Sequence, residues 1–259
     1  NNSFLISACI MGQSNMAAGA TLGSNHNSRA TDGELVASRG FWPGLCSSIK
    51  HSSRFASFTL LSKGDYPCEM NISLPFCLVN NNVAKNQLEI MPAYWWMYNM
   101  YAIARNTSKY LKRDTRKRRI QNIEFETLAP DTIEEIIAAC KMLEVWTAKS
   151  YLRSQNEDAD KYEYHELRAL GRDLMTKPEI VNELEILGEN IEKSDRKVVI
   201  LKTYNAYHAY RDMIVIYAMD AITKYMINNN TFDYDLMYKE FDGLRRKVWI
   251  NLGGQMMTQ

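Results

Sequence analysis

The sequence lacks the markers of several protein classes. No run of about 18 apolar residues occurs in its 259 residues, so we expect no membrane-spanning helix. No basic segment followed by an apolar one opens the chain, so no secretory signal is predicted. Lysine and arginine (31) nearly balance aspartate and glutamate (30), and the formal net charge is +1. This balance gives no global attraction to nucleic acid or to an anionic membrane.

Cysteine is sparse and unpatterned. The five cysteines are an odd number and none forms a CxxC pair, which argues against a disulfide framework and against a metal site. We therefore expect reduced thiols and a cytoplasmic protein. The sequence also lacks a Gly-x-Ser-x-Gly motif, a Walker loop and a His-Glu-x-x-His motif, which disfavours a hydrolase, an NTPase or a zinc protease.

A six-residue period runs through the beginning of the chain. Large apolar residues recur at this step, with small residues at most of the positions four later. The apolar positions are Phe4, Ile10, Met16 and Leu22. Such a period fits neither a helix nor simple strand alternation, but it fits a triangular coil of short strands. It resembles the left-handed parallel β-helix of hexapeptide-repeat transferases. Because the repeat is already running at its first residue, we expect further coils upstream.

The period is interrupted once. Leu22 and Ile49 are 27 residues apart, which is not a multiple of six, and the step then resumes at Phe55 and Leu61. We therefore predict that residues 1–82 form the β-helix, with an inserted loop at 24–44. Long excursions from a regular scaffold commonly carry function.

Several long motifs resemble an uncharacterised bacterial family whose members are often labelled as similar to UDP-N-acetylglucosamine pyrophosphorylase. These motifs are GQSNMAAGATLGSNHNSR, RGFWPGLCSSIKHSSRFASFTLLSKGDYP, NISLPFCLV and MPAYWWMYNMYAIARN. The resemblance extends from Asn2 to the closing WINLGGQ. The glycine-rich G-x-G-T-R signature of a nucleotidyltransferase is absent, so we expect no pyrophosphorylase activity from this chain.

The remainder, residues 83–259, is predicted to be an α-helical domain. Helices are expected from about Pro92, from Pro130, over 157–175, from Pro178, over 195–227 and over 233–250. The segment 92–111 is rich in aromatic residues and methionine. We expect it to pack on the end of the β-helix around Leu74, Phe76 and Leu78, because so apolar a segment is not left in water.

His26 is the predicted catalytic residue. It lies where the six-residue period ends, and in hexapeptide acyltransferases a histidine near the coil surface is the general base. A neutral imidazole suits that role because its pKa lies near 7. The alternative is a corner residue held by Asn25 and Asn27, which we also include among the substrate-binding residues.

Cationic residues surround the same loop and are predicted to hold the phosphates of a substrate, with Trp42 stacking on a ring. This set comprises Arg29, Arg39, Lys50, His51, Arg54 and Lys63. The alternative is a solvated basic flank on which Trp42 covers the coil. A second basic stripe, 109–119, can follow the phosphates of a nucleic acid, although acidic residues come soon after it.

The leading functional prediction is acyl transfer from a CoA-type donor to a sugar or sugar nucleotide. Acyl-CoA would be a co-substrate, and no tightly bound cofactor is expected. A non-catalytic scaffold with a helical partner-binding part is the first alternative, and nucleic-acid binding through 109–119 is the second. No membrane partner is expected, and a homo-oligomer is left open.

Overall fold

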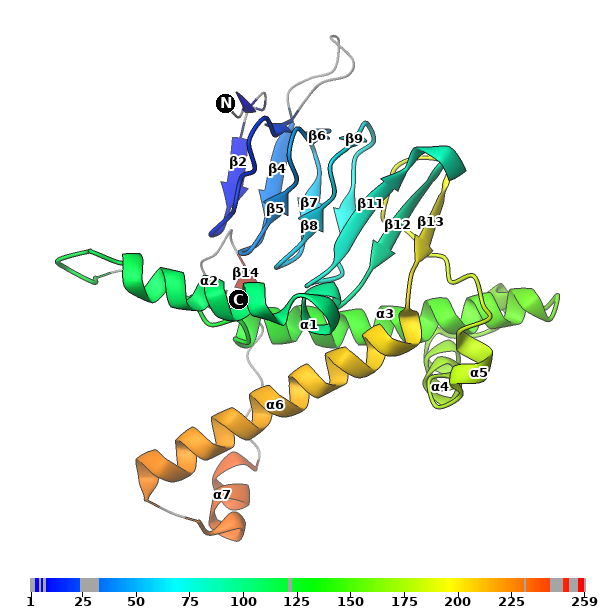
Figure 1. The fold of residues 1–259 in the computed structure, drawn as a ribbon. Helices are drawn as coiled ribbons and strands as arrows, with labels where there is room; N and C mark the ends of the chain where they lie inside the picture. Colours follow the sequence, from blue (N-terminus) through cyan, green and yellow to red (C-terminus); the bar gives the residue numbers. More distant parts are fainter. Residues whose placement is uncertain are drawn as a thin grey trace.

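The computed structural model describes residues 3–4, 6, 8–23, 33–120, 123–230, 232–242, 249–251 and 256–258. Parallel strands form the upper part of the molecule in Figure 1, and helices run beneath them and away from them. The expectation of a mixed α and β protein is therefore correct.

The strands are short and belong to three separate sheets, apart from an antiparallel pair near the C-terminus. The first sheet has the order β1 (Ser3–Phe4), β3 (Thr21–Leu22), β6 (Ser48–Ile49), β9 (Asp65–Tyr66). The second has the order β10 (Asn71–Ile72), β7 (Arg54–Phe55), β4 (Glu34–Ala37), β2 (Ala8–Met11). The third has the order β13 (Lys197–Ile200), β12 (Gln87–Met91), β11 (Leu78–Asn82), β8 (Leu60–Leu61), β5 (Trp42–Pro43). The C-terminal pair is β14 (Trp249–Asn251) and β15 (Met256–Thr258).

The prediction of a left-handed β-helix is wrong. The strands are divided among separate sheets, and no closed coil is present in the described part of the chain. The six-residue apolar period reflects only how far apart paired strand residues lie in the sequence. Trp42 pairs with Leu60 and Leu60 pairs with Leu78, so partners lie 18 residues apart. The period marks buried positions such as Leu22, Ile49 and Leu61, although Ile10 is 43% exposed. It does not specify how the strands are connected.

The predicted loop at 24–44 is shorter than expected. Its second half supplies β4 and β5, and Leu35, Ala37 and Phe41 are fully buried. Leu22 still pairs with Ile49 across the interruption. Residues 24–32 lie outside the described residues.

Seven α-helices occur among the described residues. They are α1 (Tyr94–Tyr98), α2 (Met100–Arg113), α3 (Pro130–Ser154), α4 (Tyr164–Leu174), α5 (Pro178–Val181), α6 (Thr203–Asn229) and α7 (Tyr234–Phe241). Two short 3-10 helices cover Val83–Lys85 and Ala159–Lys161. The prolines that open α3 and α5 lie at the first helical turn, where a missing N–H costs nothing.

The expected helix over 195–227 starts later, because Lys197–Ile200 forms β13. This strand pairs in parallel with β12, so Val198 lies beside Leu88 and Ile200 beside Ile90. Its β-branched residues suit a strand, and sheet pairing prevails there over helix formation. Residues 83–259 therefore contribute two strands to the third sheet as well as the helices.

One hydrophobic core joins the sheets to the helices. It includes Leu61 and Val79 from the sheets and Ile136, Leu143 and Tyr210 from α3 and α6, each fully buried. The hydroxyl of Tyr210 donates to the carbonyl of Pro75 at 2.5 Å. The long helices are therefore attached to the sheets by both apolar and polar contacts.

The aromatic segment after Pro92 packs on the sheets, as predicted, through its central tryptophan. Trp95 is 1% exposed, and its backbone N–H donates to the carbonyl of Phe76 at 3.2 Å. The centroid of its ring lies 5.7 Å from that of the Trp42 ring. Tyr98 and Met100, expected to be covered as well, are more than half exposed.

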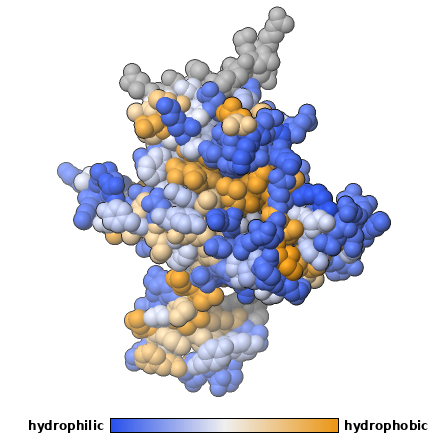
Figure 2. All heavy atoms as spheres, turned by 45° about the vertical axis from the view of Figure 1, so that its right-hand side comes forward, coloured by the Kyte–Doolittle hydropathy of each residue, from blue (hydrophilic) through white to orange (hydrophobic). Residues whose placement is uncertain are grey.

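The C-terminal half of α6, together with α7, extends below the body of the molecule. Apolar side chains gather on this arm, seen at the bottom of Figure 2, and Ile216, Met219 and Phe232 are among the exposed ones. The helices in the described ranges include none that is both long and apolar enough to cross a membrane.

Candidate functional site

A cavity of about 360 Å³ lies beside α2, and we call it the α2 cavity. Its walls come from the turn after β2, the turn between β4 and β5, α2 itself and the segment before α3. The lining residues are Gln13, Ser14, Asn15, Arg39, Gly40, Trp42, Phe58, Asn106, Thr107, Lys109, Tyr110, Arg113, Phe125 and Thr127. The cavity therefore forms where the sheets meet the helical part.

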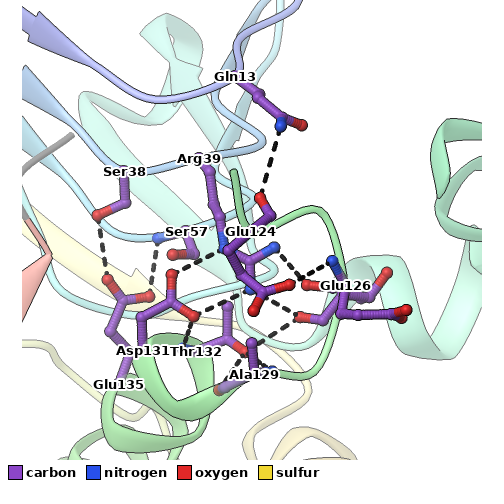
Figure 3. A network of polar contacts seen from close by, with 11 residues as sticks. Gln13, Ser38, Arg39, Ser57, Glu124, Glu126, Ala129, Asp131, Thr132 and Glu135 are labelled. Atoms are coloured by element: carbon purple, nitrogen blue, oxygen red, sulfur yellow. Dashed lines mark hydrogen bonds and ion pairs between the residues drawn. The ribbon is translucent and has the colours of Figure 1, made fainter. Parts of the chain in front are cut away.

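Arg39 fastens one wall of this cavity. Its guanidinium donates to both carboxylate oxygens of Asp131, at 2.7 and 3.0 Å, and both side chains are almost fully buried. It also donates to the carbonyl of Glu126. Figure 3 shows these contacts converging on Arg39 from the first turn of α3 and from the segment before it. Because Asp131 neutralises it, Arg39 acts as a positioning residue and not as a free cation.

A titratable carboxylate lies beneath the same network. Glu135 accepts from the backbone N–H of Ser57 at 2.9 Å and from the hydroxyl of Ser38 at 3.2 Å (Figure 3). Burial raises the pKa of Glu135 to about 7, although the hydrogen bonds from Ser57 oppose the shift. Glu135 therefore changes charge near neutral pH.

The opposite wall is cationic. Arg105, Lys109 and Arg113 are spaced four residues apart on α2 and share one face of that helix. Lys109 and Arg113 line the cavity. The charge of Arg105, then burial, then Arg113 lower the pKa of Lys109. Among the described residues, no carboxylate forms an ion pair with any of the three.

Aromatic rings complete the lining. Tyr110 stacks on Phe125 with ring centroids 4.8 Å apart, and Trp42 and Phe58 come from the sheet side. Aromatic walls with a few charged groups are typical of small-molecule sites. The arrangement suits an anionic group at Lys109 and Arg113 and a flat ring against the aromatic wall.

Gly40 keeps the cavity open at the turn between β4 and β5. Its φ is +79°, and an added Cβ would lie 2.5 Å from a ring carbon of Phe58. Any side chain there would be strained and would displace the Phe58 ring.

The structure divides the predicted site residues. Arg39 and Trp42 line the α2 cavity. His26, Asn25, Asn27 and Arg29 lie outside the described residues. The lining does not include the four remaining predicted residues, Lys50, His51, Arg54 and Lys63.

His51 is buried away from the α2 cavity. Its Nδ1 lies 3.3 Å from the hydroxyl of Ser52, and an added Cβ on Gly33 would come within 2.6 Å of that nitrogen. Arg54 is exposed on β7. Of the described cationic residues around the former loop, Arg39 alone lines the α2 cavity.

The sequence singled out the basic stripe and Arg39 but gave no signal that they meet. Arg39 and Lys109 are far apart in the chain, and only the packing of α2 beside the β4–β5 turn brings them to one cavity. Within the described ranges, no three His, Cys, Asp or Glu side chains gather as a metal site would require.

The protein has a mixed α and β fold, and cationic and aromatic side chains line its α2 cavity. Over 260 residues, the chain is 41% identical to an uncharacterised protein of Treponema pallidum (strain Nichols). That alignment covers 100% of this chain and 34% of the relative, so the chain spans about a third of the relative's length. No family model matches the chain. No solved structure matches it either.

Proposed function

We propose that the chain binds a phosphorylated small molecule with a planar ring in the α2 cavity. The nucleotide part of a CoA-type donor or of a nucleotide sugar has this chemistry. The observation that carries the proposal is the uncompensated charge of Lys109 and Arg113 beside the Tyr110 and Phe125 rings. Three like charges four residues apart destabilise an isolated helix, and a bound anion relieves that repulsion.

The size of the cavity agrees with this class of ligand. Small-molecule pockets are on the order of 300 to 1,000 Å³, and the α2 cavity, at about 360 Å³, is at the lower end. Asn106 and Thr107 from α2, and Gln13 and Asn15 from the turn after β2, supply hydrogen-bonding groups for ribose or base edges. A nucleotide fits better than an entire coenzyme.

Acyl transfer to a sugar or sugar nucleotide stays a prediction built on this binding. The lining of the α2 cavity includes no His, Asp or Glu side chain. A general base would therefore have to come from elsewhere, and His26 remains the predicted one. The chain spans 34% of the Treponema relative, so any activity of a protein of that full length is also only a proposal.

Nucleic-acid binding through 109–119 is less favoured by the contacts. α2 ends at Arg113, so the stripe does not continue as one helical face. Arg116 and Arg119 both pair with Asp114, at 2.8 and 3.5 Å, which neutralises part of the charge. The scaffold alternative predicts no small-molecule affinity and is tested by the same experiment.

The test is a binding titration with adenosine diphosphate, CoA and UDP-N-acetylglucosamine. Binding is measured by the change in tryptophan fluorescence and by calorimetry. Arg113→Gln should weaken binding about tenfold, because a charge-assisted hydrogen bond is lost. Lys112→Gln is the matched control, since it removes the same charge from α2 outside the cavity lining. Absence of binding by all three ligands, or equal loss in both variants, would refute the proposal.

We also propose that the chain works in the cytoplasm. The five cysteines, Cys9, Cys46, Cys68, Cys77 and Cys140, are free. Free thiols are typical of proteins in a reducing compartment.

A further inference from the structure

A second cavity, of about 460 Å³, lies where α3, α4 and α6 meet, and we call it the α4 cavity. Four of its lining side chains are cationic and one is acidic. The cations are Lys141, Arg168, Arg172 and Arg211, and the acid is Glu144. The lining therefore carries an excess of three positive charges.

Glu144 is the centre of this cluster. It is 3% exposed and accepts from Nε of Arg168 at 2.9 Å, from Nε of Arg172 at 3.2 Å and from the hydroxyl of Tyr207 at 3.0 Å. Arg211 donates to the same Tyr207 hydroxyl at 3.4 Å. One arginine would neutralise the charge of the buried carboxylate, so the cluster carries more positive charge than Glu144 compensates.

The arginines keep donors available for a ligand. Arg168 and Arg172 use their Nε atoms on Glu144, and the side chain of Arg172 is 56% exposed. Within the described chain, no second carboxylate forms an ion pair with either of them. The terminal nitrogens of a guanidinium form a planar fork that matches the oxygens of a phosphate.

A close helix contact builds the cluster. An added Cβ on Gly171 would lie 1.9 Å from the carbonyl oxygen of Glu144, so the backbones of α3 and α4 touch there. Arg168 and Arg172 flank Gly171 on α4. The contact therefore sets both guanidinium groups over Glu144 on rigid elements.

The rest of the lining is apolar or neutral. Ile137, Cys140, Ile214 and Val215 also line the cavity. Burial raises the pKa of Cys140 to about 12, so this thiol is neutral and adds no negative charge. A ligand with an anionic head and an apolar substituent fits this mixture of cationic and apolar lining residues.

We propose that the α4 cavity binds the phosphate group of an apolar phosphate monoester, held by Arg168, Arg172 and Arg211. It is separate from the α2 cavity, with which it shares no lining residue. The same head group occurs on a small phosphate ester and on a phospholipid such as phosphatidic acid.

The test measures how phenyl phosphate and inorganic phosphate protect individual arginines of the full chain from modification by phenylglyoxal. Peptide mass spectrometry identifies which arginines are modified. Both probes should protect Arg172 and Arg211, and phenyl phosphate should do so at lower concentration because apolar residues also line the cavity. Arg172→Gln combined with Arg211→Gln should weaken phenyl phosphate binding at least about tenfold. Lys177→Gln, a charge loss just beyond α4 and outside the cavity, is the matched control.

Two further experiments show which cavity binds the phosphate and whether a phospholipid supplies it. Lys109→Gln with Arg113→Gln removes the two uncompensated charges of the α2 cavity and should leave protection of Arg172 and Arg211 unchanged. Cosedimentation with phosphatidylcholine vesicles, with and without phosphatidic acid, identifies a lipid source if only the acidic vesicles bind through Arg172 and Arg211. The proposal is overturned if neither phosphate protects the arginines of the wild type. It is also overturned if phenyl phosphate protects Arg168 equally well in the wild type and in the double variant that lacks Arg172 and Arg211.

Discussion

Arg39 and Asp131 lie 92 residues apart in the sequence and form a buried, two-pronged ion pair between the β4–β5 turn and the first turn of α3. The pair fixes the segment that carries Phe125 and Thr127 into the wall of the α2 cavity. It connects the geometry of the candidate site to the packing of the sheets on the helices.

Breaking this ion pair from one side should be costly. Asp131→Ala leaves the Arg39 charge buried without its carboxylate, and the free energy of unfolding should fall by about 3–5 kcal/mol. Arg39→Met combined with Asp131→Leu should lose less than Asp131→Ala alone, because no charge is left buried. Urea unfolding of the three proteins measures this. A double variant less stable than Asp131→Ala would show that the pair's geometry, and not burial of the lone charge, dominates.

Glu135 should make stability depend on pH. Its pKa rises from an ordinary 4.5 to about 7 on folding, so the protonated form is stabilised in the native state. That contribution is complete below about pH 4.5 and is lost as the pH rises through about 7. Glu135→Gln should therefore be more stable than the wild type at pH 8, by about 1–3 kcal/mol. Denaturation at pH 5, 6, 7 and 8 measures the difference, and Glu134→Gln is the neighbouring control. A difference that does not grow with pH contradicts the assignment.

Lys109 should oppose stability in the free protein. Lys109→Gln removes the repulsion from Arg105 and Arg113, so we expect a higher Tm without ligand and weaker nucleotide binding. Calorimetry with and without adenosine diphosphate measures both effects. Lys112→Gln should change neither by as much. A lower Tm for Lys109→Gln would mean that its aliphatic stem packs in the cavity wall.

Gly171 should tolerate no side chain. In Gly171→Ala the new Cβ would lie 1.9 Å from the Glu144 carbonyl oxygen, and backbone cannot move aside as a flexible side chain does. We expect a loss of about 1–3 kcal/mol or more, together with weaker phosphate binding in the α4 cavity. Ala169→Gly, on the exposed side of the same helix, is a control for helix propensity alone. An unchanged Tm for Gly171→Ala would show that α4 can shift away from α3.

Local signals located most helices but not the connections between strands. Pro130 and Pro178 marked the starts of α3 and α5, because proline at the first turn leaves no unsatisfied donor. The six-residue period found the buried residues Leu22, Ile49 and Leu61, yet the strand partners of these three residues lie 17 or more residues away along the chain. Periodicity carries no information on such pairings.

The candidate site could be predicted from the sequence only in part. Arg39 and Trp42 were identified from their charge and ring, and both line the α2 cavity. Lys109 was assigned to a separate stripe, because nothing local indicates that α2 returns to the β4–β5 turn. The Gly171 contact and the three arginines around Glu144 depend on how α3, α4 and α6 cross, which is a tertiary property.

The third sheet has a consequence for synthesis of the chain. Its outermost strand, β13, pairs with β12 although more than a hundred residues separate them along the chain. At roughly 5–20 residues per second, β12 waits on the order of 5–20 s on the ribosome before its partner emerges. During that interval its edge, with Leu88 and Ile90 not yet covered by β13, offers free backbone donors and acceptors to any other extended segment. Nascent chains of this protein should therefore need a chaperone most between the emergence of Met91 and that of Ile200.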